Sequence, residues 1–206
     1  MLRVGLTGGI ASGKSTVASM LRDREIPVLE MDPLGHELLE PGQAAYDEVV
    51  REFGKGILDS TEKVNRSRLG AIVFSDPEKR ERLNRILHPR ILDVVQNWFA
   101  ALDRPGGPEL AVAEAALIFE SAFNKQLDRV IVCWCRPEQQ LARLVERGLA
   151  AEQARQRIAA QMSADEKRRL ASDVIDCSGS IEDTERQAGQ VLANLKQLAA
   201  PGRNIS

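Results

Sequence analysis

The sequence has no apolar stretch long enough to span a membrane, and its first residues read as a strand rather than as a signal peptide. It also lacks an excess of one charge, because 28 Lys and Arg residues stand against 30 Asp and Glu residues, for a formal net charge of -2. Such a chain has no general electrostatic attraction for nucleic acid. We therefore expect a cytoplasmic protein without membrane or nucleic-acid partners, present as a monomer or a small homo-oligomer.

Cysteine is scarce, and the three residues present are Cys133, Cys135 and Cys177. They form no Cys-x-x-Cys redox pair, and without histidines at matching spacing they make no zinc site. We expect buried, reduced thiols at all three positions. The length of 206 residues is enough for one α/β domain with a full core and inserted subdomains.

The strongest motif is Gly8-Gly9-Ile10-Ala11-Ser12-Gly13-Lys14-Ser15, which fits the pattern of a phosphate-binding loop (P-loop). The residues before it, 2–7, alternate in polarity and predict a strand. After it, Val17, Met20 and Leu21 recur at helical spacing, so a helix is predicted from about Lys14. A strand, a glycine-rich turn and a helix form the context that the motif requires.

The chemistry of such a loop comes from its backbone. Gly8 and Gly13 let the chain turn tightly around an anion, and the helix N-terminus adds a partial positive charge. Lys14 is expected to reach the β- and γ-phosphates, and the Ser15 hydroxyl to bind Mg²⁺. GTPases, ATPases and small-molecule kinases share this loop, so the motif alone does not identify the acceptor.

A second strand is predicted at residues 27–31, and Asp32-Pro33 follows it. Asp before Pro is a helix start signal, with Asp32 as the N-cap and Pro33 as the first helical residue. In open α/β sheets, ligands bind outside the carboxyl ends of the strands. Asp32 is therefore also a candidate to accept a proton from the acceptor, and the two roles are compatible.

Residues 34–102 are predicted to be mostly helical, with helices at 43–53 and 66–74. A longer helical stretch is predicted to open at Asp76-Pro77 and to be interrupted at His88-Pro89. A simple crossover between parallel strands needs far fewer residues. We expect residues 32–102 to form an inserted helical domain that binds the acceptor.

Three further strands are predicted at residues 110–113, 129–134 and 173–177, with a closing helix at 181–198 and a frayed tail at 201–206. Glu114, at the end of the third strand, is either a carboxylate on the magnesium side or a solvated acid. The nucleotide-binding core is expected to comprise residues 1–31, 103–135 and 170–206.

Arginines recur in residues 136–169, which we interpret as a lid. Arg143 and Arg147 lie four residues apart on one helix face, where they are candidates to clamp the transferring phosphoryl group. The alternative is a solvated amphipathic pair of helices, which we favour for Arg155, Arg168 and Arg169.

Two fragments resemble GTPase signatures. Asp32-Pro33-Leu34-Gly35 fits Asp-x-x-Gly but follows Ser15 too closely, and Asn124-Lys125 begins a guanine-binding Asn-Lys-x-Asp that fails at Leu127. We interpret both as chance matches. A small-molecule kinase accounts better for a P-loop, a helical insert and an arginine-rich lid in that order.

Several further runs match one family's motifs in order and spacing. They are Thr7-Gly8-Gly9-Ile10-Ala11-Ser12-Gly13-Lys14-Ser15-Thr16, Asp32, Leu87-His88-Pro89, Leu117-Ile118-Phe119-Glu120, Arg157-Ile158-Ala159-Ala160-Gln161 and Asp173-Val174-Ile175. Through them the sequence resembles the dephospho-coenzyme A kinases over nearly its whole length. It departs from that family's usual residues at Glu30, Ala116, Gly148 and Cys177, and keeps Lys14 and Asp32.

The resemblance implies a P-loop kinase of the nucleotide-kinase type, with a five-stranded parallel sheet in the order 2-3-1-4-5 and helices on both faces. It implies phosphorylation of the ribose 3′-hydroxyl of dephospho-coenzyme A by ATP and Mg²⁺, which yields coenzyme A and ADP. ATP and dephospho-coenzyme A are then the small-molecule partners.

The resemblance and the motif together give the candidate site residues. Asp32, Lys14 and Arg143 are the expected catalytic residues, Ser15 the expected metal ligand, and Asp32, His88, Glu120 and Arg157 the expected acceptor-binding residues. His88 is equally explained as a residue at a helix break. The expected nucleotide-binding residues are Gly8, Gly9, Ala11, Ser12, Gly13, Lys14, Ser15, Thr16 and Arg147.

Two other functions stay open on the sequence. Another nucleoside or nucleotide kinase would share the P-loop and lid, and would phosphorylate uridine or a nucleoside monophosphate. A nucleotide-dependent switch would act through partners without a small-molecule acceptor, although the missing guanine-binding motif and the large helical insert argue against it.

Overall fold

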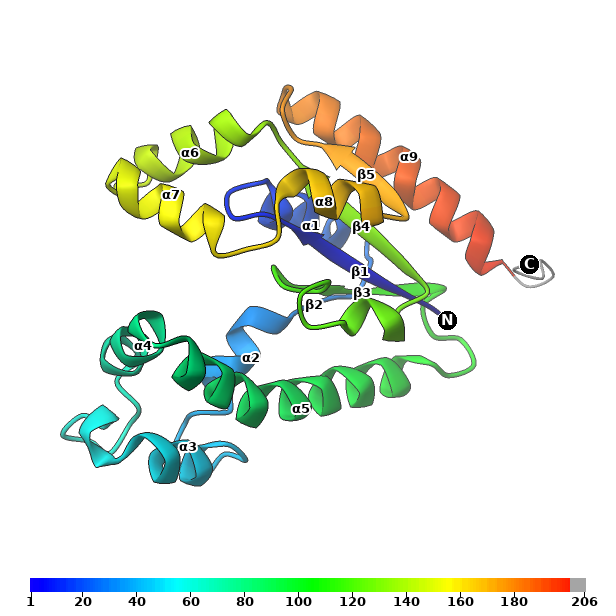
Figure 1. Cartoon of the computed structure of the whole chain (residues 1–206). Helices are drawn as coiled ribbons and strands as arrows, with labels where there is room; N and C mark the ends of the chain where they lie inside the picture. The colour runs from blue at the N-terminus through cyan, green and yellow to red at the C-terminus, as the bar shows by residue number, and fades with distance from the viewer. Residues whose placement is uncertain (201–206) are drawn as a thin grey trace. The chain divides into compact units, whose positions relative to one another are not determined.

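The structure, a computed structural model, describes residues 1–200 except for the side chain of Phe74. The tail predicted to fray, residues 201–206, lies outside the described residues. The chain divides into two compact units (Figure 1). One comprises Met1–Glu30 and the chain from Phe99 onward, and the other is Met31–Trp98.

The first unit is built on a five-stranded sheet in the order β2-β3-β1-β4-β5, with all neighbouring strands parallel. This confirms the predicted order. Gly5 of β1 lies opposite Ala113 of β3 and Val130 of β4, so the chain leaves the middle of the sheet when β1 ends. The strands are β1 (Leu2–Gly8), β2 (Val28–Glu30), β3 (Leu110–Glu114), β4 (Arg129–Trp134) and β5 (Asp173–Asp176).

Helices α1 and α9 cover one face of this sheet with an apolar core. The helices of the unit are α1 (Lys14–Arg22), α6 (Pro137–Glu146), α7 (Ala151–Ala159), α8 (Ala164–Leu170) and α9 (Ile181–Ala199), with a 3-10 turn η2 (Phe123–Gln126). The core includes Val17 and Leu21 of α1, Leu192 and Leu195 of α9, and Val4, Leu6, Ile131 and Ile175 of the strands. The interior residues of β4, Val130–Cys133, are all buried, as expected for an inner strand of a parallel sheet.

The opposite face of the sheet is closely packed at Gly5, where there is no room for a side chain. A Cβ at this position would meet the side chains of Leu127 and Ile118, so glycine lets the segment after β3 approach the sheet closely. The three cysteines are buried and free of disulfides, as the sequence predicted.

The second unit has its own apolar core, which includes Leu38, Val49, Ile57, Leu69 and Ile86. Its helices are α2 (Met31–Glu37), α3 (Tyr46–Phe53), α4 (Arg66–Ser75) and most of α5 (Pro77–Leu102), with a 3-10 turn η1 (Lys55–Ile57). Asp76 accepts hydrogen bonds from the N–H groups of Glu78 and Lys79 (3.0 and 3.2 Å), which confirms the predicted start of α5.

Two predictions for this unit are wrong. Helix α2 begins at Met31, so Asp32 lies in the first turn and is not the N-cap; an acid there still interacts favourably with the helix dipole. Helix α5 continues through Pro89, so His88-Pro89 does not interrupt it. Burial of Ile86 and Val95 on the two sides of Pro89 offsets the helix-breaking cost of about 3 kcal/mol.

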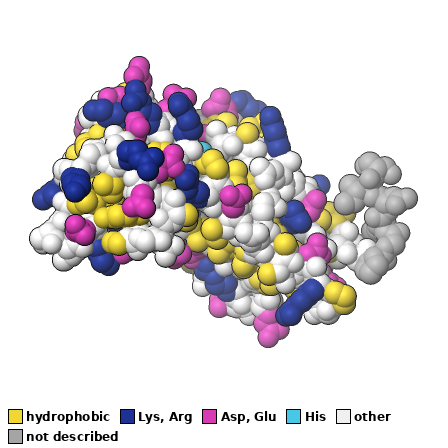
Figure 2. All heavy atoms as spheres, turned by 90° about the horizontal axis from the view of Figure 1, so that it is seen from below, with side chains coloured by type: hydrophobic (Ala, Val, Ile, Leu, Met, Phe, Trp, Pro, Cys, Tyr) yellow, Lys and Arg dark blue, Asp and Glu magenta, His cyan; other side chains and the backbone are white. Residues whose placement is uncertain are grey.

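Charges of both signs are interspersed over the face shown in Figure 2, in agreement with the balanced composition. Among residues 1–200, no helix combines the length and the apolarity that crossing a membrane requires.

Ile131 tests the core of the first unit, because its side chain is fully buried in β4. We expect Ile131→Ala to lower the free energy of unfolding by about 2–5 kcal/mol through lost burial and a cavity. The control Ile181→Ala, at a position 60 % exposed, should cost below about 1 kcal/mol. Urea unfolding followed by circular dichroism measures both, and equal losses would contradict this account of the core.

Candidate functional site

The predicted P-loop joins the end of β1 at Gly8 to the start of α1 at Lys14. The first helical bond is donated by the Val17 N–H to the Gly13 carbonyl (3.1 Å). The N–H groups of Lys14, Ser15 and Thr16 precede it and have no partner within the helix. Together with the partial positive charge of the helix end, these groups form a binding site for an anion.

Ala11 and Gly13 of this loop have left-handed backbone conformations, with φ angles of 58° and 106°. Glycine adopts such angles freely, but at Ala11 the conformation is strained and must be held by its surroundings. Arg143 of α6 holds it, since its Nη1 donates to the Ala11 carbonyl (3.1 Å) and its Nη2 to the Cys177 carbonyl (2.7 Å).

The peptide groups of Ile10 are bound from two sides by glutamines. The Ile10 N–H donates to Oε1 of Gln161 (2.9 Å), and Nε2 of Gln140 donates to the Ile10 carbonyl (2.9 Å). Gln140 lies on α6, and Gln161 lies in the turn after α7. Side chains far away in the sequence therefore fix the outer edge of the loop.

Ser12 supplies a further sign that the loop is built for a ligand. Its hydroxyl is buried and has no hydrogen-bond partner among the described residues. A buried hydroxyl without a partner is costly, and a bound anion within reach would remove that cost.

A cavity of about 200 Å³ opens beside the loop. It is lined by Ala11, Gly13, Thr16, Arg143, Arg147, Cys177, Gly179, Ile181 and Thr184. The loop, α6 and the turn before α9 therefore meet around one space with two guanidinium groups on its wall. Both arginines predicted to act near the nucleotide line this cavity.

Cys177 lies directly against the loop, because a Cβ on Gly13 would come within 3.0 Å of its Sγ. A hydrogen bond between the Cys133 and Cys177 thiols lowers the pKa of Cys177, to which the Arg143 guanidinium also contributes. The same bond, together with burial, raises the pKa of Cys133. Of the two thiols, Cys177 is therefore the first to lose its proton as the pH rises.

Other predicted site residues of the first unit lie on α1, in the segment after β3 and on α7. Lys14 is half-buried at the first position of α1, and Ser15 and Thr16 are exposed beside it. Oε1 of Glu120 lies 2.9 Å from Nζ of Lys167 and accepts from the Met162 N–H (2.9 Å). Arg157 is exposed in the last turn of α7.

Two predicted acceptor-side residues lie in the second unit. Asp32 is exposed in the first turn of α2. His88 is half-buried in α5, and burial lowers its pKa, so it is neutral at pH 7.

The structure adds two polar residues that the motifs did not indicate, Gln140 and Lys167. It also gives Gln161, which stood in a motif, a contact with Ile10 that the motif did not indicate. A signal was present for Gln140 and Lys167. Gln140 lies three residues before Arg143 and shares its helix face, and Lys167 lies three residues after the buried Ala164. A lysine on the buried face of a short helix is unusual enough to indicate a buried partner.

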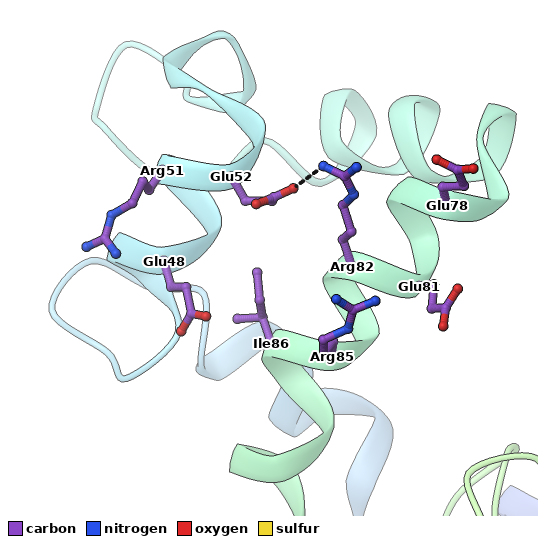
Figure 3. Close-up of a pocket in the computed structure, with 8 residues that line it drawn as sticks. All are labelled: Glu48, Arg51, Glu52, Glu78, Glu81, Arg82, Arg85 and Ile86. Carbon is purple, nitrogen blue, oxygen red and sulfur yellow. Dashed lines mark hydrogen bonds and ion pairs between the residues drawn. The ribbon is translucent and has the colours of Figure 1, made fainter.

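The second unit has a groove of its own between α3 and α5, of about 610 Å³ (Figure 3). Nearly all of its lining side chains are charged, with both signs present, and Arg82 pairs with Glu52 across it (2.9 Å). Arg51 points away from the facing helix. All of these charged residues except the half-buried Glu48 are exposed, so we interpret the groove as a solvated surface whose ion pair contributes little to stability.

The sheet order and the loop between β1 and α1 give the chain the fold of the P-loop kinases. A solved structure of shikimate kinase from Acinetobacter baumannii has this fold, with a TM-score of 0.53 at 18% identity over 96% of this chain and 94% of its own. At that identity the likeness concerns the fold alone.

More specific matches cover almost the whole chain. The family model described as dephospho-CoA kinase matches residues 2–183. A dephospho-CoA kinase of Geobacillus kaustophilus is 43% identical over 97% of this chain and 98% of its own length. Among solved structures, TT1252 from Thermus thermophilus has a TM-score of 0.81 at 34% identity, covering 94% of this chain and 97% of its own. Dephospho-CoA kinase from Campylobacter jejuni has a TM-score of 0.71 at 26% identity, covering 96% and 98%.

The chain belongs to the dephospho-CoA kinase family. This confirms the resemblance seen in the motifs.

Gly13 tests the loop geometry. We expect Gly13→Ala to weaken nucleotide binding at least about tenfold, because the new Cβ strains a left-handed backbone and presses on Cys177. Gly148→Ala is the matched control, since Gly148 also has a positive φ (90°) but open space around it. Calorimetric titration with ATP measures the affinities, and an equal effect of both substitutions would contradict the contact with Cys177 as the cause.

Proposed function

We propose that this protein transfers the γ-phosphoryl group of ATP to the 3′-hydroxyl of dephospho-coenzyme A, giving coenzyme A and ADP. The observation that carries the proposal is a family match from residue 2 to residue 183 together with an anion-binding loop between β1 and α1. Phosphoryl transfer requires mainly positioning and charge stabilisation, which such a loop provides.

The donor phosphates bind to the loop. The N–H groups from Ala11 to Thr16 surround them, apart from that of Ser12, which donates to the Gly9 carbonyl (3.2 Å). Gly8 and Gly9 give room for the turn, and the Ser12 hydroxyl gains a partner. Lys14 neutralises the charge that develops as the γ-phosphoryl leaves. Arg143 and Arg147 line the neighbouring cavity and bring positive charge from α6.

The Ser15 hydroxyl is our candidate ligand for Mg²⁺. Residues 1–200 contain no cluster of three or more His, Cys, Asp or Glu side chains that would hold a metal by themselves. One exposed hydroxyl suits Mg²⁺, which is usually bound by one or two protein ligands, substrate phosphates and water. When bound, the ion supplies neutralisation of phosphate charge.

Asp32 is the residue that we propose to accept the proton of the 3′-hydroxyl, or to orient that hydroxyl in line with the γ-phosphate. We propose residues 32–102 as the acceptor-binding domain, with His88 among its contacts, and residues 136–169 as the lid, with Arg157 directed to the acceptor. Glu120 acts at the edge of the acceptor site through its contacts with Lys167 and Met162.

The reaction is tested by measuring ADP release from ATP and Mg²⁺ with and without dephospho-coenzyme A. We expect release that depends on the acceptor, and a product heavier by one phosphate in mass spectrometry. Uridine and a nucleoside monophosphate serve as competing acceptors in parallel. Phosphorylation of either in place of dephospho-coenzyme A would favour another nucleotide kinase, and ADP release without any acceptor would favour a switch.

Asp32→Asn tests the proton acceptor, because it preserves size and removes the charge. We expect kcat to fall by about 10²–10⁴-fold with little change in stability. Glu37→Gln, at an exposed position on the same helix, is the control and should retain wild-type turnover. Near-normal kcat in Asp32→Asn would exclude the proposed role and leave Asp32 as a helix-stabilising acid.

A further inference from the structure

Lys167 is the most deeply buried charged side chain among the described residues, with none of its surface exposed. It lies on α8, a short helix whose start is fixed by reciprocal hydrogen bonds between Ser163 and Glu166. Its Nζ donates to the Ala116 carbonyl (2.5 Å) and lies 2.9 Å from Oε1 of Glu120. Removing an ammonium group from water is costly, and packing alone would be served as well by an apolar side chain.

The Ala116 carbonyl and the Glu120 carboxylate each make a second contact. The Ala116 carbonyl also accepts from the Thr7 hydroxyl (3.2 Å), and Thr7 immediately precedes Gly8 at the start of the P-loop. Oε1 of Glu120 also accepts from the Met162 N–H (2.9 Å), in the turn between α7 and α8. Lys167 thus connects the end of β1 with the turn that carries Gln161.

Gln161 completes the connection, because its side chain accepts from the Ile10 N–H. The contacts form a closed ring that runs from Thr7 to Ala116, Lys167, Glu120 and the Met162-Gln161 turn, then to Ile10 and back along the loop. We call this the Lys167 ring. The ring includes the first half of the P-loop, up to Ile10. It does not include the N–H groups from Lys14 to Thr16.

We propose that Lys167 is a positioning residue of the phosphoryl transfer, whose ammonium group closes this ring and so fixes the P-loop in its binding conformation. The inference rests on the proposed function. A misplacement of about 1 Å at a reacting group can reduce a rate about 10²-fold, so a loop held at Ile10 and Thr7 has a direct effect on turnover. The ring also explains why a buried position on α8 is charged.

The variants separate positioning from stability. Lys167→Met alone opens the ring but leaves Glu120 without its cation. The double variant Lys167→Met/Glu120→Gln opens the ring and removes both charges, and replacement of a buried pair by uncharged groups is often neutral for stability. Gln161→Ala opens the same ring elsewhere, at a half-buried residue, without burying any charge. Arg169→Met, at an exposed position on α8, is the control.

For the double variant and for Gln161→Ala we expect kcat to fall by about ten- to a hundredfold, with a smaller change in KM for dephospho-coenzyme A and a Tm near that of the wild type. Arg169→Met should retain wild-type kcat. A folded double variant with kcat within about fivefold of the wild type would overturn the proposal. If the double variant does not fold, the test rests on Gln161→Ala, and a kcat of that variant within about fivefold of the wild type would overturn the proposal.

Amide hydrogen exchange supplies a readout that does not depend on the reaction. The Ile10 amide is hydrogen-bonded through Gln161, so opening the ring at Lys167 should speed deuterium uptake in the peptide around Ile10. Unchanged uptake there in the double variant would contradict the ring. Absence of acceptor phosphorylation by the wild type, in contrast, would contradict the proposed function and leave the exchange result standing.

Discussion

The backbone of the P-loop depends on being held from outside. Ala11 has a left-handed conformation that alanine does not adopt without cost, and the loop's inward N–H groups must stay available for an anion. Hydrogen bonds from outside the loop hold it in this conformation. The Arg143 guanidinium binds the Ala11 carbonyl, and Gln140 and Gln161 bind the peptide groups of Ile10. With these contacts the loop is held in one shape without a ligand, so the cost of ordering it is met during folding and not during binding.

The rest of the first unit serves this arrangement. β1 lies in the middle of the sheet and is hydrogen-bonded on both sides, which gives the loop a rigid starting point at Gly8. α1 is fixed at the other end by Val17 and Leu21 in the core. α6 follows β4, the neighbour of β1, so Gln140 and Arg143 reach the loop from the adjacent strand. Cys177 follows β5 and packs on Gly13. Its side chain therefore forms part of the wall of the cavity beside the loop.

Much of this was predictable from the sequence, because local signals and the global fold agree. The glycine spacing, Lys14 and Ser15 located the loop, and short alternating or apolar runs located the strands to within one or two residues. The failures have physical causes. Pro89 was expected to end a helix, but burial of Ile86 and Val95 outweighs the local preference. Lys167 was missed because a lysine reads as solvent-exposed until its partners, remote in sequence, are known. The roles of Asp32 and His88 stay predictions, and the Asp32→Asn variant addresses the first of them.

The contacts on Ile10 and Ala11 span 130 to 151 residues of sequence. During synthesis the glycine-rich motif leaves the ribosome early, but the residues that shape it are made in the last third of the chain. Non-local contacts of this kind form late in folding, because they need the intervening chain to be organised first. The sequence of residues 8–15 is therefore not sufficient for the conformation of the loop. In another protein that lacks counterparts of Gln140, Arg143 and Gln161, we expect the same sequence to adopt a different backbone conformation.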